Sequence, residues 1–256
     1  MRSLRDSIDM GYTFKIFRFD PKKDAEPHEQ EFSVDLGGEE KVTVLDALFK
    51  IQQTQDKSLS FRYCCRLAMC GSCALVINGR EGLACKTLIR DLSSGPISLK
   101  PLNHIAVVKD LTVDLKSLIA RLRKMEPYFI PKSPSAEPAK IKPASKERKI
   151  IGLNTECIAC GSCVSACTMM HWDPDYMGPM GLNRAFCLIA DSRDLTGERL
   201  ERVADENGIY RCHMEFNCTD VCPKHLSPTR GIHYLKRQIL WQTVKKLNPF
   251  RTGGNR

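Results

Sequence analysis

Cysteines are the residues through which this chain is best equipped to do chemistry. Its 256 residues include 13 of them. The N-terminus lacks the apolar core of a secretory signal, and in an unsecreted chain so many thiols are more often metal ligands than disulfides. The odd count also argues against a complete disulfide framework. All but Cys64 and Cys187 fall into spaced runs, so the sequence predicts metal centres.

The first run has the spacing C-x4-C-x2-C-x11-C. Its close trio matches the plant-type [2Fe–2S] pattern, in which thiolates converge on two irons from one loop. Gly71 and its small neighbours keep that loop tight, so backbone N–H groups can point at the sulfurs. Structural zinc is the alternative, but zinc usually takes two separated pairs of ligands. The predicted [2Fe–2S] ligands are Cys65, Cys70, Cys73 and Cys85.

The second run, C-x2-C-x2-C-x3-C from Cys157 to Cys167, is typical of bacterial ferredoxins. The same spacing recurs from Cys212 to Cys222, with Glu215 in place of the second cysteine. In two-cluster proteins the fourth cysteine of such a run serves the other cluster. Seven cysteines in two interlocking registers disfavour zinc. The crossed assignment is Cys157, Cys160, Cys163 and Cys222 for a [4Fe–4S] cluster, and Cys167, Cys212 and Cys218 for a [3Fe–4S] cluster.

The elements that must position these cysteines differ between the two halves. In the first half, residues 12–20 and 31–36 alternate apolar and polar side chains, as strands do, and Asn78-Gly79 is a hairpin signal. Residues 43–55 carry apolar side chains at helical spacing and predict one helix packed on a sheet. The second half has short helical runs and a late helix over 231–247, with Ile232, Leu235, Ile239 and Leu247 on one face. The predicted class is α+β.

Two domains are expected, over residues 1–112 and 113–256. The first would hold the [2Fe–2S] cluster, and the second is helical and would hold the other two. Residues 127–149 contain five prolines and many lysines, and predict an extended connector.

Composition excludes several classes of protein. With 42% apolar and 27% charged residues the chain is globular, and no apolar run reaches the ~18 residues of a membrane span. The net charge is +9, of which +8 falls in residues 111–256. This charge indicates a solvated basic surface, or alternatively an anionic partner, a membrane surface or compensation for buried clusters. Three oxidised clusters with thiolates carry roughly −2 each, which lowers the net charge to about +3 and weakens a nucleic-acid role.

The chain closely resembles the iron–sulfur subunits of succinate dehydrogenase and fumarate reductase, from about residue 12 to 245. The motifs that carry the resemblance are CRLAMCGSCALVINGREGLAC (65–85), VVKDLTVDL (107–115), ECIACGSCVSAC (156–167), GPMGLNRAFCLIADSRD (178–194) and RCHMEFNCTDVCPKHLSPTR (211–230). The resemblance implies an N-terminal β-grasp domain like plant-type ferredoxins, followed by an α-helical domain like bacterial ferredoxins.

The resemblance also implies a function and partners. Electrons would pass between the flavin of an FAD-containing flavoprotein subunit and quinone, through [2Fe–2S], [4Fe–4S] and [3Fe–4S] in turn. Membrane anchor subunits, with or without haem b, would lie at the quinone end. The chain would be peripheral on the cytoplasmic face of a prokaryotic plasma membrane, or on the matrix side of the mitochondrial inner membrane. It would hold no dicarboxylate site and bind no nucleic acid.

Two residues match family positions near the quinone head group, and a third residue beside them is a further candidate. Trp172 can donate a hydrogen bond through its indole N–H, and His213 can relay protons near neutral pH. His171 stands where many relatives have an aromatic residue, and is a third candidate. The alternatives are an interface aromatic for Trp172 and a residue packed around the cluster for His213.

Three positions depart from the family pattern. Ala68 replaces the usual glycine of the [2Fe–2S] loop, Thr168 stands where many relatives have proline, and Glu215 stands where they have a small apolar residue. We expect Glu215 to remain unligated, so that the site stays [3Fe–4S]. The alternative is a fourth iron held by its carboxylate.

Other functions fit parts of the sequence. One is a free-standing multi-cluster carrier of the ferredoxin type, and another is the iron–sulfur subunit of a thiol-linked fumarate reductase. A third is a zinc-dependent interaction module, which would be colourless and free of iron. The sequence does not determine the direction of catalysis or the quinone.

Overall fold

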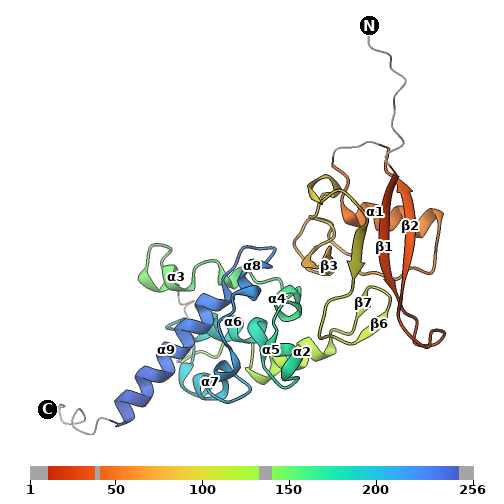
Figure 1. The fold of residues 1–256 in the computed structure, drawn as a ribbon. Coiled ribbons are helices and arrows are strands. Elements are labelled where there is room, and N and C mark those ends of the chain that lie inside the picture. Colours follow the sequence, from red (N-terminus) through yellow and green to blue (C-terminus); the bar gives the residue numbers. More distant parts are fainter. Residues whose placement is uncertain (1–10, 38–40, 133–139, 248–256) are drawn as a thin grey trace, which may run out of the picture. The chain divides into compact units, whose positions relative to one another are not determined.

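The computed structural model describes residues 11–37, 41–132 and 140–247. The chain divides into two compact units. Unit 1 takes the chain up to Leu115 together with Ile158–Ser165, and unit 2 takes Lys116–Cys157 and the chain from Ala166 onward. Helices and strands are both present (Figure 1), as the α+β class predicts.

Unit 1 is built on a five-stranded sheet with the order β2-β1-β5-β3-β4. Its strands are β1 (Gly11–Arg18), β2 (His28–Asp35), β3 (Ala74–Ile77), β4 (Arg80–Leu83) and β5 (Ile97–Lys100), and a separate pair is formed by β6 (Val107–Lys109) and β7 (Thr112–Val113). β1 pairs antiparallel with β2 and parallel with β5, while β3 pairs antiparallel with β4 and β5. The other elements are α1 (Val44–Thr54), the short helix η1 (Ile89–Asp91) and α4 (Ser162–Ser165).

Local sequence signals explain these elements. Phe14 and Ile16 alternate along β1 and are fully buried. The turn between β3 and β4 is Asn78-Gly79, with φ of 48° and 79°, as a two-residue hairpin requires. Thr43 caps α1: its hydroxyl accepts from Asp46 N at 3.2 Å, and its own N–H donates to the Asp46 carboxylate at 2.9 Å. The predicted strands, hairpin and helix are thus confirmed.

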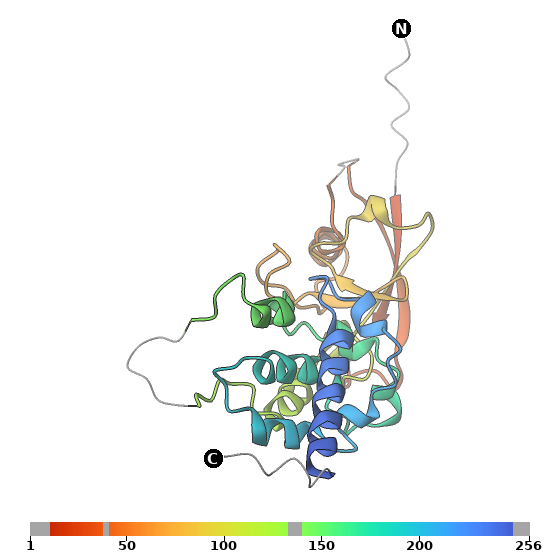
Figure 2. The same cartoon turned by 90° about the vertical axis from the view of Figure 1, so that its left-hand side faces the viewer.

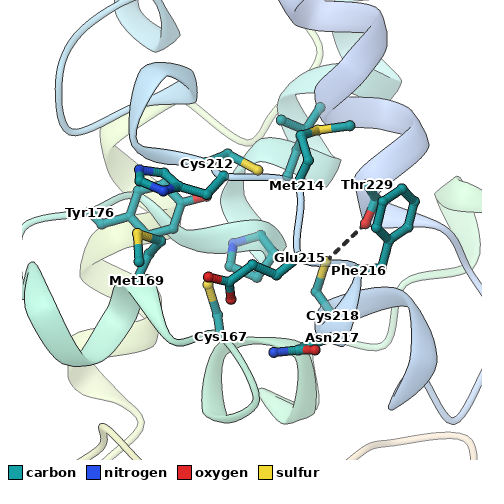
Figure 3. Close-up of a pocket in the computed structure, with 13 residues that line it drawn as sticks. Cys167, Met169, Tyr176, Cys212, Met214, Glu215, Phe216, Asn217, Cys218 and Thr229 are labelled. Atoms are coloured by element: carbon teal, nitrogen blue, oxygen red, sulfur yellow. Dashed lines mark hydrogen bonds between the residues drawn. The ribbon is translucent and has the colours of Figure 1, made fainter.

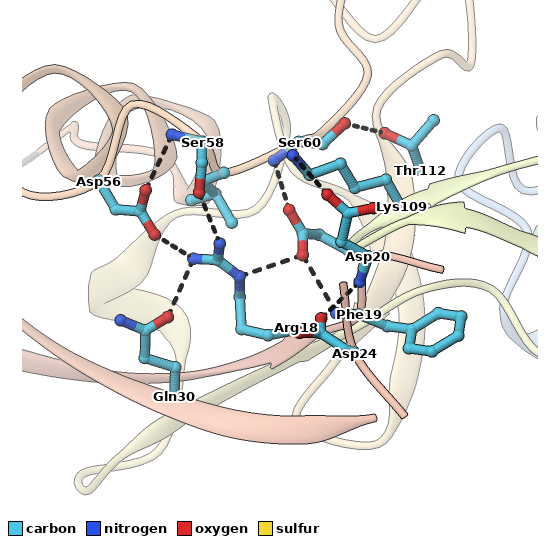
Figure 4. A network of polar contacts seen from close by, with 12 residues as sticks. Arg18, Phe19, Asp20, Asp24, Gln30, Asp56, Ser58, Ser60, Lys109 and Thr112 are labelled. Atoms are coloured by element: carbon cyan, nitrogen blue, oxygen red, sulfur yellow. Dashed lines mark hydrogen bonds and ion pairs between the residues drawn. The ribbon is translucent and has the colours of Figure 1, made fainter. Parts of the chain in front are cut away.

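A buried arginine joins segments of unit 1 that are distant in sequence (Figure 4). The Arg18 guanidinium donates to Asp110 at 3.1 Å and to Asp56 at 2.5 Å. Asp110 also accepts the backbone N–H of Ser60 at 2.9 Å. These bonds fix the segment that leads into the first cysteine loop against the end of β1.

Unit 2 is helical. Its helices are α2 (Lys116–Lys124), α3 (Lys146–Ile151), η2 (Asn154–Glu156), α5 (Met169–Trp172), α6 (Gly178–Ile189), α7 (Thr196–Val203), η3 (Ile209–Arg211), α8 (Asn217–Asp220) and α9 (Pro228–Leu247). α9 is one uninterrupted helix of 20 residues (Figure 2). In the described part of the chain, no helix combines the length and apolar character needed to cross a membrane.

The core of unit 2 lies between α6 and α9. Ile232, Leu235 and Ile239 are buried on one face of α9, as predicted, whereas Leu247 is 76% exposed. Leu247 therefore does not extend the buried face, because it stands at the exposed C-terminal end of the helix. A Cβ on Gly231 would lie 2.8 Å from the Phe186 ring, so the two helices are in close contact.

A second buried arginine organises the loops of unit 2. Arg199 donates to the Asp194 carboxylate at 3.1 Å and to the carbonyls of Met125 and Tyr128 at 2.7 and 3.0 Å. Asp194 itself accepts the Ile130 N–H at 2.8 Å. The start of the predicted 127–149 connector is therefore tied to the loop after α6.

The end of that connector differs from the prediction. Residues 133–139 lie outside the described residues, but 146–149 belong to α3 and are helical, not extended. The Ser145 hydroxyl accepts the Arg148 N–H at 3.1 Å and caps this helix. The last proline of the segment is Pro143, so nothing prevents a helix after it.

Candidate metal centres

The first cysteine loop turns its backbone toward a thiol. Arg66 and Ala68 both adopt left-handed φ values, of 57° and 54°. Cys65 Sγ accepts the backbone N–H groups of Leu67, Met69 and Cys70 at 3.4, 3.3 and 3.3 Å. Three donors on one sulfur stabilise a thiolate, the form that binds iron. Ala68 keeps the left-handed conformation that favours glycine, at a steric cost of about 1–2 kcal/mol.

The thiols of this loop lie close enough to influence one another. The Ser72 hydroxyl, helped by backbone groups, lowers the pKa of Cys70 to about 6. Burial first, and then the neighbouring Cys85 and Cys70 thiols, raise the pKa of Cys73 to about 12. The structure thus brings together Cys65, Cys70, Cys73 and Cys85, as the spacing predicts, and the N–H donors fit a [2Fe–2S] cluster.

Gly71 brings this loop into close contact with the second cysteine run. A Cβ on Gly71 would lie 2.7 Å from Cβ and 2.9 Å from Cα of Cys160. Gly71 has φ of +74°, which also favours glycine. The backbone beside Cys70 therefore packs directly on Cys160, both within unit 1.

The internal repeat in the sequence is also a repeat of the backbone. A shift of 55 residues along the sequence aligns η2 with η3, Ala159 (φ 52°) with Met214 (φ 62°), Gly161 (φ 86°) with Phe216 (φ 67°), and α4 with α8. Each run thus uses a short helix, two left-handed residues and a second short helix. This turn presents the first three ligand positions of a ferredoxin run, and in the later copy the middle position is Glu215.

Three thiols line one pocket in unit 2 (Figure 3). Cys167, Cys212 and Cys218 line a pocket that opens to solvent. Cys218 Sγ lies 3.3 Å from the Thr229 hydroxyl. The three cysteines predicted for one cluster thus face a common space.

Burial dominates the electrostatics of this pocket. It raises the pKa of Cys167 to about 11, and it raises the pKa values of Cys218 and of the Tyr176 hydroxyl. Thiolates in such a place need nearby positive charge, which the irons of a cluster supply. Tyr176 and Thr229 were missed by the sequence reasoning, because neither has a recognisable ligand spacing.

The remaining cysteines fall in different surroundings. Of the predicted [4Fe–4S] set, Cys160 and Cys163 belong to unit 1 and Cys157 and Cys222 to unit 2, so the set stays a prediction. Cys222 Sγ accepts the Leu226 N–H at 3.4 Å. Cys187 is buried in α6, which raises the pKa of its thiol to about 12, and Cys64 is exposed.

Among the described residues, no three His, Cys, Asp or Glu side chains converge tightly enough for a single metal ion. The ligands of an iron–sulfur cluster lie farther apart than those of one zinc ion, because irons and sulfides occupy the space between them.

The predicted quinone residues are all exposed. His213 lines the three-thiol pocket. His171 and Trp172 lie on α5 with ring centroids 5.0 Å apart, and Trp172 is 75% exposed. Beside them Asp173 and Arg211 form an ion pair at 2.7 Å, which the sequence reasoning missed. The roles of the three residues stay predictions.

Comparisons with known proteins identify both halves of the chain. Residues 13–120 match the family described as a 2Fe-2S iron-sulfur cluster binding domain, and residues 154–226 match a 4Fe-4S dicluster domain. The chain is 42% identical over 230 residues to the mitochondrial succinate dehydrogenase [ubiquinone] iron-sulfur subunit 1 of Oryza sativa subsp. japonica, covering 88% of this chain and 81% of that one.

Two further relatives extend the comparison. The chain is 39% identical over 233 residues to the succinate dehydrogenase iron-sulfur subunit of Paracoccus denitrificans, covering 90% of this chain and 89% of that one. A chain of the Mycobacterium smegmatis Sdh1 complex in the apo form has a similar structure, with a TM-score of 0.82 and 25% identity over 94% of this chain and 98% of that chain.

Proposed function

The chain belongs to the succinate dehydrogenase iron–sulfur subunits, which are the electron-transfer subunits of succinate:quinone oxidoreductases. From this premise we propose which of its cysteines hold each iron–sulfur cluster. As a member of this family it carries [2Fe–2S], [4Fe–4S] and [3Fe–4S] clusters. When bound, these clusters accept and release single electrons.

Each cluster is assigned to one set of thiols. Cys65, Cys70, Cys73 and Cys85 hold [2Fe–2S]; Cys157, Cys160, Cys163 and Cys222 hold [4Fe–4S]; Cys167, Cys212 and Cys218 hold [3Fe–4S]. The pocket shared by the last three thiols is the observation that carries the assignment. The three N–H donors on Cys65 support the first set.

The proposed order of the clusters is the one that membership of this family implies. We assign a β-grasp fold to the first domain, expected over 1–112, and a bacterial-ferredoxin-like helical fold to the second, over 113–256. Electrons enter at [2Fe–2S] from the flavin of an FAD-containing subunit and leave from [3Fe–4S] to quinone. The contact of Gly71 with Cys160 supports direct transfer from the first cluster to the second.

The quinone end lies beside the three-thiol pocket. His213 on the pocket wall, with Trp172 and His171 on α5, receives the quinone head group there. Membrane anchor subunits, with or without haem b, cover this end. The chain is peripheral, on the cytoplasmic face of a prokaryotic plasma membrane or on the matrix side of the mitochondrial inner membrane.

The decisive experiment is an assay of the native complex, run with succinate and quinone and in reverse with fumarate and quinol. We expect succinate-dependent quinone reduction that copurifies with a flavoprotein, together with EPR signals of all three clusters. A chain isolated without a flavoprotein would support a free-standing carrier. A colourless, iron-free native protein would exclude electron transfer altogether.

A further inference from the structure

Thr168 and Glu215, two of the three residues that depart from the family pattern, are hydrogen-bonded to each other. The Thr168 hydroxyl donates a hydrogen bond to the Glu215 carboxylate, although 47 residues separate them. Thr168 directly follows the pocket thiol Cys167, and Glu215 itself lines the pocket. The two departures are therefore one structural feature, located at the three-thiol site.

The backbone places Glu215 where a ligand belongs. In the earlier copy of the repeat the same position is Cys160, between left-handed Ala159 and Gly161. Glu215 stands between left-handed Met214 and Phe216. Figure 3 shows its side chain reaching into the pocket, toward Cys167. A turn that presents a thiolate in one copy thus presents a carboxylate in the other.

A carboxylate is a competent ligand for iron. A [3Fe–4S] cluster lacks one corner iron, and a fourth ligand at this position could bind one there. The Thr168 hydroxyl competes for the same carboxylate, because it occupies an oxygen lone pair and fixes the side-chain rotamer. Ligation of iron by that oxygen requires this bond to break.

We propose that the fourth corner of this cluster is a latent divalent-metal site, which Thr168 keeps closed by holding Glu215 as a non-ligand. The inference rests on the [3Fe–4S] assignment made above. Removal of the hydroxyl releases the carboxylate and lets the site take a fourth iron. The Thr168–Glu215 pair thus decides whether the site holds three irons or four.

The conversion balances in atoms and charge. One electron, from dithionite or from succinate through the flavoprotein, reduces the oxidised [3Fe–4S] core to its neutral form. That core then takes up one Fe²⁺ to give [4Fe–4S]²⁺. A bond forms between the iron and a Glu215 oxygen, while the Thr168 hydrogen bond and the waters on Fe²⁺ are released.

The test uses the purified complex, reduced with dithionite, titrated anaerobically with Fe²⁺ and then reoxidised. EPR of the oxidised [3Fe–4S] cluster and iron per chain are measured. Thr168→Val should lose the signal and gain one iron at roughly tenfold lower Fe²⁺ than the wild type, the equivalent of one charge-assisted hydrogen bond. Thr168→Ser retains the hydroxyl and should behave as the wild type.

Further variants test the Glu215 carboxylate with and without the Thr168 hydroxyl. Thr168→Val combined with Glu215→Gln should keep the [3Fe–4S] signal at all Fe²⁺ concentrations, since a neutral amide is a poor iron ligand. Glu215→Gln alone should also resist conversion, which tests the carboxylate without altering Thr168. Equal Fe²⁺ uptake by Glu215→Gln and wild type at the Fe²⁺ concentration that converts the wild type, or conversion of Thr168→Val and Thr168→Ser at the same Fe²⁺ concentration, would overturn the proposal.

The wild type separates this inference from the proposed function. An oxidised wild-type complex without a [3Fe–4S] signal but with one extra iron would overturn the closed-site proposal and leave electron transfer intact. Absence of both the signal and the iron would instead refute the ligand assignment on which the inference rests.

Discussion

At the residue scale, each unit relies on one buried arginine to hold its loops. Arg18 in unit 1 and Arg199 in unit 2 each bind a buried aspartate, Asp110 and Asp194. A buried ion pair is weak evidence of stability relative to apolar residues, but breaking one leaves an uncompensated charge. These arginines are therefore sensitive positions far from any thiol chemistry.

Arg199→Ala should reduce the free energy of unfolding by about 3–5 kcal/mol, because Asp194 would remain buried without its partner. The measurement is anaerobic urea unfolding followed by circular dichroism. Arg202→Ala is the matched control: Arg202 is 43% exposed on the same helix, and its ion pair with Glu126 should contribute less than about 1 kcal/mol. Equal losses in both variants would contradict this account.

Asp56 provides a pH test. The Ser58 hydroxyl and then Arg18 lower the pKa of Asp56 to about 2 from 3.8. A lowered pKa gives stability that is fully present above pH 3.8 and lost as pH falls toward 2. Asp56→Asn should therefore show its full destabilisation at about pH 6 and progressively less as the pH falls from 3.8 toward 2, measured by urea unfolding at a series of pH values. A penalty that stays constant across that lower range would be inconsistent with this pKa.

At the element scale, the cysteine loops depend on close backbone contact. Gly71→Ala adds a Cβ 2.7 Å from Cβ of Cys160 at a residue with φ +74°. We expect loss of the [2Fe–2S] EPR signal, because the loop must move away from Cys160. Gly79→Ala is the control: its φ is +79°, but no atom lies within 4 Å. The Gly79→Ala variant should keep the cluster. Loss of the [2Fe–2S] signal in both variants would instead attribute the loss to backbone strain and not to the contact with Cys160.

The buried face of α9 should be more sensitive to truncation than its exposed face. Leu235 is fully buried and Leu240 is 65% exposed on the same helix. Leu235→Ala should cost about 2–5 kcal/mol in the free energy of unfolding, from lost transfer energy and a cavity. Leu240→Ala should change it by less than about 0.5 kcal/mol in urea unfolding of the purified chain. Similar values for the two would show that α9 does not pack as described.

At the scale of the whole molecule, three clusters in series predict that loss of the last cluster stops electron transfer to quinone but not reduction of the first cluster. Cys218→Ala removes one of the three thiols in the unit 2 pocket. In the assembled complex we expect succinate still to reduce [2Fe–2S], while quinone reduction falls to background. EPR after succinate addition and a quinone assay measure the two ends separately. Normal quinone reduction in this variant would refute the assigned order.

The sequence by itself determined the features that depend on local spacing. The intervals between cysteines predicted three ligand sets, the Asn78-Gly79 pair predicted a hairpin, and the apolar spacing over 43–55 predicted a helix. These features depend on residues a few positions apart, whose geometry is set by backbone dihedrals and by the number of residues in a loop. The repeated turn is of this kind, and it allowed Glu215 to be recognised as a replaced ligand.

Only the tertiary structure decided which distant side chains meet. Arg18 and Asp110 are 92 residues apart, and Thr168 and Glu215 are 47 apart, so no local periodicity connects them. Tyr176 and Thr229 join the thiol pocket in the same way. Such contacts form because folding packs separate segments together to bury apolar surface, and the polar groups enclosed there must then find partners among themselves.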